Sequence, residues 1–223
     1  MAELDITSWN KLLTNAVSNG DVDYTQWQNN PRFDTLVEQI GTSQTKEMSQ
    51  HQKLAFYINA YNIIAAQGIL SGRSPSSFIG RYVYFKRDKY LVAGERISLH
   101  TLEHDLIRPM GEPRIHFAIV CASQSCPILQ SSAFTPQYLD QQLQAAAIKF
   151  INNPQLNQFD TAARRAELSS IFKWFEEDFV ATGGSLQDYL APLVDNEKIA
   201  NLLRQNAFEI SYLNYDWNLN GTL

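Results

Sequence analysis

The sequence RIHFAIVCASQSCP, residues 114–127, decides how the rest of the chain is interpreted. It contains both cysteines of the protein and one of its four histidines. Its first half, Ile115–Ala122, is an apolar run of the length and composition typical of a buried β-strand. Small and polar residues follow, which indicates a tight loop. We therefore expect His116 on a central strand and Cys126 in the loop that comes after it.

The composition predicts a globular protein with one domain, residues 1–223. With 223 residues, of which 44% are apolar and 18% charged, the chain is long enough for a single sizeable core. The net charge of −5 and the scattered Lys and Arg residues argue against nucleic-acid binding. No apolar run reaches the roughly 18 residues that a membrane-spanning helix needs, so we expect no transmembrane segment.

The N-terminal residues show no basic segment followed by an apolar core, so we expect no signal peptide in this chain. This favours a cytoplasmic location, but an exported protein whose signal has been removed would have the same sequence. The pattern contains no signal for the oligomeric state.

Hydrophobic spacing predicts a helix-rich α+β fold. The longest helical pattern, residues 43–71, is apolar nearly all round in its second half, so we expect this helix to be central and buried. The other expected helices cover residues 8–17, 33–40, 98–108, 135–151, 169–179, 186–190 and 196–204. A hairpin is expected at 82–93, with single strands at 166–169 and 208–213. Such short strands predict a small sheet, mixed or antiparallel.

Metal and cofactor chemistry finds no support in the motifs. Zinc sites usually show paired short spacings such as CxxC or HExxH, and neither occurs here. His116 and Cys121 would also point to opposite faces of a regular strand. The chain has no glycine-rich phosphate loop and no GxSxG motif. We expect no metal and no cofactor.

Cys126 is the expected nucleophile. It lies in a small polar loop, and Pro127 restricts it to an extended or turn conformation. Cys121 shares a strand face with apolar residues and is most simply a small buried hydrophobe. A disulfide or redox pair between the two cysteines stays open. His116, on the face with small residues, is either the base that serves Cys126 or a core histidine bonded to the backbone.

A third group should orient the imidazole, and Glu103 on the short helix before His116 is the best candidate. Alternatively, Glu103 is a solvent-exposed charge on that helix. The neighbouring His104 could replace His116 as the base. Backbone N–H groups of residues 123–126, which comprise Ser123, Gln124, Ser125 and Cys126, would hold an oxyanion.

Asn59 and Asn62 lie in the buried half of the long helix, where an unpaired amide costs about 1–3 kcal/mol. Each amide either bonds the backbone nearby, or polarises a substrate carbonyl or fixes an active-site loop.

Five motifs together resemble the domain-of-unknown-function family 547, over about residues 21–220. They are FYINAYN (56–62), SLHTLEH (98–104), RIHFA (114–118), SCP (125–127) and YDWNLN (215–220). The family occurs widely in bacteria and in plants and looks related to papain-like cysteine hydrolases. The resemblance implies a papain-like core in rearranged chain order and a triad of Glu103, His116 and Cys126. It also implies supporting roles for Asn59, Asn62 and Arg114.

These observations predict a cysteine hydrolase or acyltransferase that acts on a peptide or a small acyl substrate. The alternative is a non-catalytic domain that binds a peptide or small ligand on the same fold. Neither the motifs nor the spacing identifies the substrate.

Overall fold

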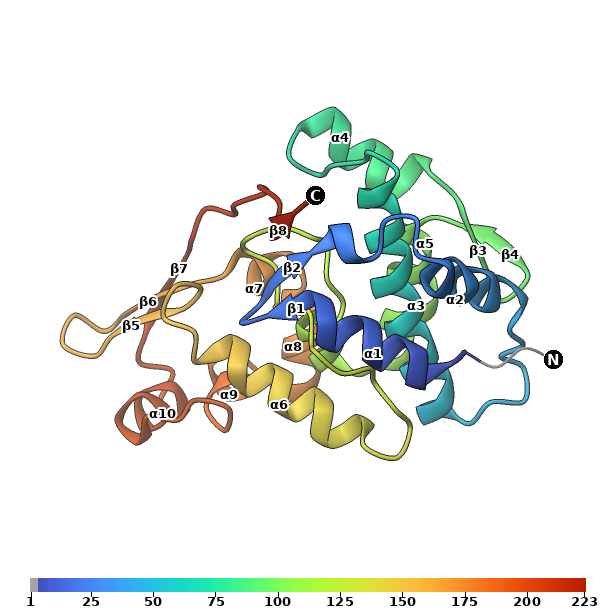
Figure 1. Ribbon diagram of the computed structural model, residues 1–223. Helices are drawn as coiled ribbons and strands as arrows, with labels where there is room; N and C mark the ends of the chain where they lie inside the picture. Colours follow the sequence, from blue (N-terminus) through green and yellow to red (C-terminus); the bar gives the residue numbers. More distant parts are fainter. Residues whose placement is uncertain (1–3) are drawn as a thin grey trace.

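The computed structural model describes residues 4–223 and is about half helical with small sheets, an α+β fold in one compact domain, as expected (Figure 1). Its α-helices are α1 (Ile6–Ala16), α2 (Pro31–Thr42), α3 (Gln50–Leu70), α4 (Phe78–Tyr82), α5 (Leu99–Thr101), α6 (Leu139–Ile151), α7 (Ser170–Trp174), α8 (Glu176–Gly183), α9 (Leu186–Leu190) and α10 (Glu197–Arg204).

Short 3₁₀ helices are η1 (Tyr24–Gln26), η4 (Arg108–Met110) and η5 (Pro113–Phe117), and π-helical turns are η2 (Val83–Arg87) and η3 (Leu102–Ile107). The strands are β1 (Val17–Ser18), β2 (Asp21–Asp23), β3 (Tyr90–Val92), β4 (Glu95–Ile97), β5 (Gln158–Asp160), β6 (Arg165–Leu168), β7 (Glu209–Tyr212) and β8 (Gly221–Thr222).

The long helix α3 forms the centre of the molecule, as its apolar pattern predicts. Ser49 accepts from the backbone of Gln52, whose side chain accepts from the backbone of Ser49, and this capping box begins the helix. Nearly every residue from Leu54 to Ile69 is buried. Figure 1 shows α1 and α2 in front of or beside α3. The central helix is therefore the support on which the remaining elements pack.

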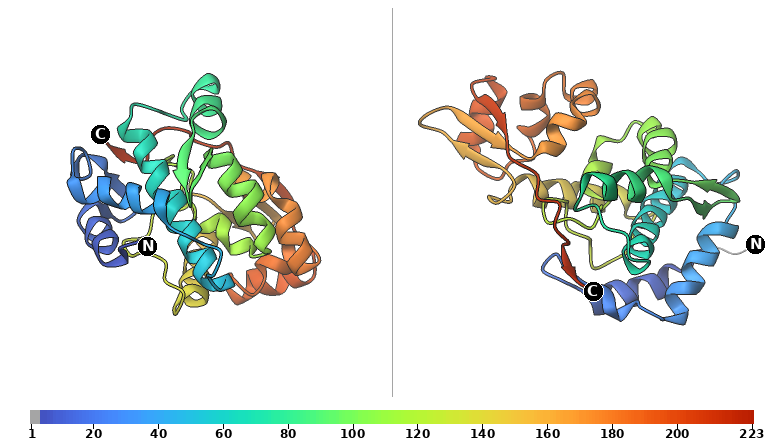
Figure 2. Two further views of the ribbon diagram at one scale, coloured as in Figure 1. Left: turned by 90° about the vertical axis from the view of Figure 1, so that its right-hand side faces the viewer. Right: turned by 90° about the horizontal axis from the view of Figure 1, so that it is seen from above.

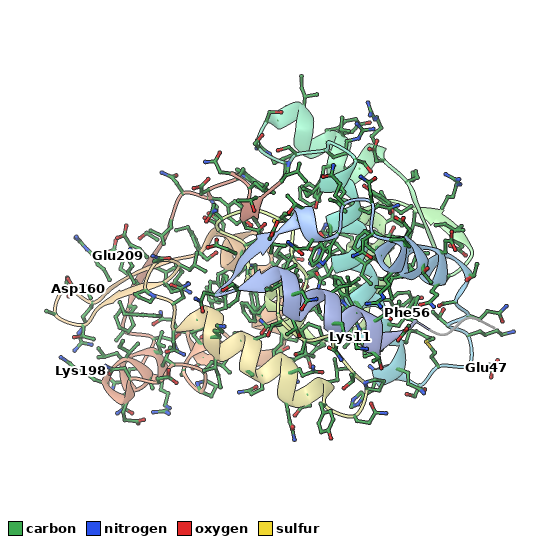
Figure 3. All side chains as sticks on the ribbon, viewed as in Figure 1. Lys11, Glu47, Phe56, Asp160, Lys198 and Glu209 are labelled. Carbon is green, nitrogen blue, oxygen red and sulfur yellow. The ribbon has the colours of Figure 1, made fainter. Side chains whose placement is uncertain are left out.

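The strands form three small sheets rather than one. Two of these sheets are mixed: β1–β2–β8 and β5–β6–β7 each combine one antiparallel and one parallel pairing, whereas β3–β4 is an antiparallel hairpin. In β5–β6–β7, Asp160 and Glu209 lie on the side of the view opposite Glu47 (Figure 3). The strands expected at 166–169 and 208–213 are confirmed as β6 and β7.

Two expected strands are wrong. Residues 115–122 form no strand: η5 ends at Phe117 and an irregular turn follows. The apolar residues of the 115–122 segment are buried because this loop packs against the core. An apolar run indicates burial, but it does not show whether the buried segment is a strand or a loop. The hairpin lies at Tyr90–Ile97, and residues 82–87 are helical.

The buried side chains form two clusters. One gathers around α3 and extends from Leu4 to Leu143, and the other joins Phe117 to α6 and to the elements from β6 to residue 208. The chain end returns to the start of the chain, where β8 pairs with β2 (Figure 2). Among the residues described, no helix is both long and apolar enough to span a bilayer.

Candidate functional site

A cavity of about 230 Å³ lies where the two clusters meet and contains most of the chemically reactive side chains identified in the sequence. Its wall includes Glu103, three histidines, both cysteines and a set of aromatic rings: His100, His104, His116, Cys121, Cys126, Phe85, Trp174, Phe175, Tyr215 and Trp217. The predicted triad residues Glu103, His116 and Cys126 thus share one cavity, although their detailed contacts differ from the expected ones.

Cys121, rather than Cys126, has the environment of a reactive thiol. Its sulfur lies 2.9 Å from the hydroxyl of Ser123, 3.2 Å from that of Tyr215 and 3.0 Å from the sulfur of Cys126. Burial raises the pKa of Cys121, but the hydrogen bonds of its sulfur with Cys126, Ser123 and Tyr215 outweigh burial and lower the pKa to about 7. The thiol is partly exposed, so the expectation that it is a buried hydrophobe is wrong.

Cys126 is buried, with 6% of its surface exposed, so the expected exposure of this thiol is wrong. Its sulfur accepts the backbone N–H of Cys121 at 2.9 Å. Burial raises the pKa of Cys126, and the neighbouring charge on Cys121 raises it further. Within this close pair, the pKa of Cys121 is lowered because its sulfur lies beside the hydroxyls of Ser123 and Tyr215, whereas burial dominates at Cys126 and raises its pKa.

The loop between the cysteines is clamped by the chain end. The backbone N–H groups of Gln124 and Ser125 donate to the carbonyls of Asn218 and Asp216, at 2.8 and 3.2 Å. Ala122 has a φ of 61°, a left-handed conformation that costs a non-glycine residue free energy unless its surroundings hold it. The terminal residues therefore maintain the geometry that places Tyr215 beside Cys121.

This clamp removes the expected oxyanion donors. The N–H of Cys126 donates to the carbonyl of Ser123 at 3.0 Å, and those of Gln124 and Ser125 are bonded to the chain end. The side chain of Gln124 donates to the carbonyl of Leu219, and the hydroxyl of Ser125 accepts from the N–H of Asp216. The Ser123 N–H is engaged as well, with Cys121. None of these groups is free for a substrate oxyanion.

His116 lies on η5 and is oriented by Asp178 of α8. Its Nε2 atom lies 2.7 Å from a carboxylate oxygen of Asp178, and its ring stacks on Phe175 at 3.9 Å. Glu103, expected to make this bond, lies elsewhere in the cavity. Burial lowers the pKa of His116 more than Asp178 raises it, so the ring is neutral, with Nε2–H donating. The Nδ1 atom is buried and has no partner among residues 4–223.

Asp178 also accepts two hydrogen bonds from Arg108, at 2.7 and 2.9 Å. Burial acts to raise the pKa of Asp178, but the hydrogen bonds from His116 and Arg108 outweigh it and hold the pKa well below its usual range. Arg108 in addition lies 2.7 Å from Nδ1 of His104. Burial, with the nearby His100 and Arg108, lowers the pKa of His104 to about 4, so His104 is neutral.

Glu103 is a buried carboxylic acid on η3. The hydroxyl of Tyr61 lies 3.4 Å from one of its oxygens. Burial raises the pKa of Glu103 to about 7, and the charge of Cys121 contributes to this shift. At neutral pH the side chain therefore exists in both protonation states, which suits an acid or base in catalysis.

The two asparagines of α3 hold backbone segments. Asn62 donates to the carbonyl of Ala118 at 3.0 Å and accepts the N–H of Val120 at 2.8 Å. Asn59 makes the same kind of paired contact with Phe134, at 2.7 and 3.0 Å. Neither side chain lines the cavity. Both amides bond the backbone, and Asn62 thereby fixes the approach to Cys121.

Arg114 also lies away from the cavity, in a surface network. It forms ion pairs with Glu112 at 2.7 Å and Asp140 at 2.6 Å. These contacts give Arg114 a role in tying η5 to α6.

Sequence reasoning missed Asp178 altogether. It lies 62 residues after His116, in a segment with several acidic neighbours and no motif of its own. Tyr215 had a signal, since it begins the YDWNLN motif, but nothing in that motif specifies contact with a cysteine.

The comparisons with known proteins support the family and go no further. The family model described as "Protein of unknown function, DUF547" matches residues 45–151, a shorter span than the resemblance seen in the motifs. No curated protein and no solved structure matches the chain. The matched region includes Glu103, His116 and both cysteines, whereas Asp178 and Tyr215 lie outside it. Over residues 45–151 the chain is therefore similar to the family of proteins of unknown function DUF547.

Proposed function

We propose that the cavity is the active site of a thiol-dependent hydrolase or acyltransferase, in which Cys121 attacks an acyl carbon. The observation that carries this proposal is the convergence of Ser123, Tyr215 and Cys126 on the sulfur of Cys121, at 2.9–3.2 Å. The Ser123 hydroxyl donates to the Tyr215 hydroxyl at 3.0 Å, so the Tyr215 proton is free to donate to the Cys121 sulfur, and such a donor favours the thiolate, which is the nucleophilic form of cysteine. The family resemblance, which implies a cysteine hydrolase, supports the same chemistry but pointed to Cys126.

Glu103 supplies the proton that such a reaction needs. The thiolate of Cys121 bonds to the acyl carbon, and the carboxylic acid of Glu103 gives its proton to the departing nitrogen or oxygen. The resulting carboxylate then takes a proton from water, which attacks the thioester and releases Cys121 as thiolate. Glu103 ends the cycle protonated, and a pKa of about 7 allows both steps near neutral pH.

His116 binds and orients in this scheme. Asp178 holds the ring in the tautomer with Nε2–H, as the acid of a catalytic triad does. The remaining Nδ1 atom can accept a hydrogen bond from an N–H or O–H of the substrate, or from the attacking water. A buried acceptor without a partner is costly, so a bound donor there gains affinity.

An activated ester tests the proposal without knowledge of the natural substrate. We expect p-nitrophenyl acetate to release about one equivalent of nitrophenolate in a burst and to leave an acetyl group on Cys121, located by peptide mass spectrometry. Cys121→Ala should abolish the burst, and Cys126→Ser should retain it. Acetyl transfer no faster than to free cysteine would contradict the proposal and favour a non-catalytic ligand-binding domain.

A further inference from the structure

We propose a second activity for this cavity: Cys121 and Cys126 form a dithiol that reduces small disulfides, with Cys121 attacking and Cys126 resolving. Both cysteines are free thiols, and their sulfurs lie 3.0 Å apart. A disulfide bond is about 2 Å long, so closure needs an approach of only about 1 Å. The pair can therefore close with little movement of the loop that carries it.

The two thiols differ in the way that such a reaction requires. Cys121 is partly exposed in the cavity, and its sulfur lies beside the hydroxyls of Ser123 and Tyr215. Cys126 is buried behind it and accepts the backbone N–H of Cys121. An external disulfide in the cavity meets the more exposed sulfur of Cys121 first, and the sulfur of Cys126 is within reach of it. This order of attack and resolution follows from access and from thiolate character.

The exchange balances without any further reactant. The Cys121 thiolate attacks one sulfur of a disulfide RSSR, the S–S bond breaks, and RS⁻ leaves and takes a proton from water. Cys126 loses its proton to solvent and attacks the sulfur of Cys121 in the mixed disulfide, which releases the second RS⁻. The protein is oxidised to the Cys121–Cys126 disulfide, and RSSR is reduced to two thiols.

The cavity favours a small disulfide. Its volume is about 230 Å³, and aromatic rings such as Trp174, Phe175 and Trp217 line it. A compact aliphatic disulfide fits such a space, whereas the charged arms of glutathione disulfide exceed it. We therefore choose 2-hydroxyethyl disulfide as the probe and glutathione disulfide as its larger comparison.

Oxidation would also stop the acyl chemistry proposed above, because the disulfide consumes the Cys121 thiolate. The exchange itself does not depend on that chemistry: it needs two sulfurs, whereas acyl transfer needs Cys121 and Glu103. The two proposals can therefore fail separately.

Intact-mass spectrometry of the reduced protein, recorded at successive times after the disulfide is added, tests the exchange. With 2-hydroxyethyl disulfide we expect loss of two hydrogens and no lasting adduct. Cys126→Ser should stop at a mixed disulfide on Cys121 that lasts at least about tenfold longer than in the wild type, because the resolving thiol is gone. Cys121→Ser should gain no adduct on that time scale. Glutathione disulfide should react more slowly than the smaller probe.

Two results would overturn the proposal. One is a wild-type protein that keeps two titratable thiols, or keeps a stable adduct, after prolonged exposure to the probe. The other is an adduct on Cys126 in the wild type. If Cys126→Ser does not fold, as judged by circular dichroism, the wild-type result decides alone. Retained acetylation by p-nitrophenyl acetate with no exchange would reject this activity and leave the hydrolase proposal intact.

Discussion

At the scale of the residue, Glu103 shows how burial changes chemistry. Its pKa is raised from 4.5 to about 7, so the folded protein binds a proton that the unfolded chain releases between these values. The stabilisation is therefore fully present below pH 4.5 and is lost as the pH rises through about 7.

Glu103→Gln should remove this pH dependence, because glutamine resembles the protonated acid and cannot ionise. In urea unfolding, the variant should gain stability relative to the wild type on going from acid to alkaline pH, by on the order of 1–3 kcal/mol. Parallel stability curves for the two proteins across that range would show that Glu103 is not the group that titrates. After acetylation by p-nitrophenyl acetate, the same variant should lose its acetyl group more slowly, since glutamine cannot take the proton from the attacking water.

Tyr215 provides a second prediction at this scale. Removal of its hydroxyl in Tyr215→Phe takes one of the donors from Cys121, so the pKa of the thiol should rise by roughly half a unit to one unit, the value of a single hydrogen bond. The measurement is the pH at which iodoacetamide labels Cys121 at half its maximal rate. Tyr57→Phe is the matched control, because its hydroxyl hydrogen-bonds with Thr45, at 3.3 Å, and its side chain is not part of the cavity wall. Equal shifts in both variants would refute a local effect of Tyr215.

The sequence identifies much of the residue-level chemistry but not its pairing. Glu103, His116 and Cys126 do share a cavity, and the asparagines of α3 do bond backbone. Asp178 escaped prediction because a carboxylate 62 residues from its histidine has no local pattern. The roles of the two cysteines depend on which sulfur the Tyr215 hydroxyl contacts, and this is decided by tertiary contacts from the chain end.

At the scale of the element, α3 positions the cysteine loop through Asn62. Asn62→Ala should destabilise the protein by about 1–3 kcal/mol, because the backbone of Ala118 and Val120 loses its partners. It should also move the pH midpoint of Cys121 labelling, since the loop is no longer held.

Asn59→Ala is the control on the same helix. Its amide makes equivalent bonds to Phe134, away from the cavity wall, so a similar loss of stability should leave the labelling midpoint unchanged. If both variants move the midpoint equally, the positioning role of Asn62 fails.

The long central helix was predictable from its period, whereas two short segments that resemble strands were not. The helix expected at 43–71 appears as α3, which begins only at Gln50 but has the expected burial, because an apolar pattern around a whole helix has few alternatives. Residues 115–122 have the composition of a strand but find no partner strand, and they fold as η5 and a turn. The Tyr82–Phe85 segment alternates like a strand, yet its residues continue α4 as a π-helical turn. In both segments tertiary packing overrides local preference.

At the scale of the whole molecule, Asp178 links the two clusters. It lies on α8 and pairs with Arg108, which follows η3, at 2.7 Å, and with His116 on η5. Because the pKa of Asp178 is lowered in the folded protein, its contribution to stability is fully present above the pKa of the unfolded chain. It is lost as the pH falls from there through the lower pKa of the folded protein.

Asp178→Asn should therefore lower the free energy of unfolding at neutral pH by about 1–2 kcal/mol, allowing for solvent screening of a partly exposed pair. The difference from the wild type should shrink as the pH falls towards 3. Glu209→Gln, in an exposed pair with Arg165 at 3.7 Å, is the control and should change little. Equal effects of the two substitutions would deny Asp178 its linking role.

The central claim is that Cys121, rather than Cys126, is the reactive thiol. The pH dependence of iodoacetamide labelling, followed for each cysteine by peptide mass spectrometry, tests it most directly. We expect Cys121 to be labelled first, with a midpoint near pH 7, and Cys126 to react far more slowly. Faster labelling of Cys126, or a Cys121 midpoint at or above that of an ordinary thiol, about 8.5, would contradict the account.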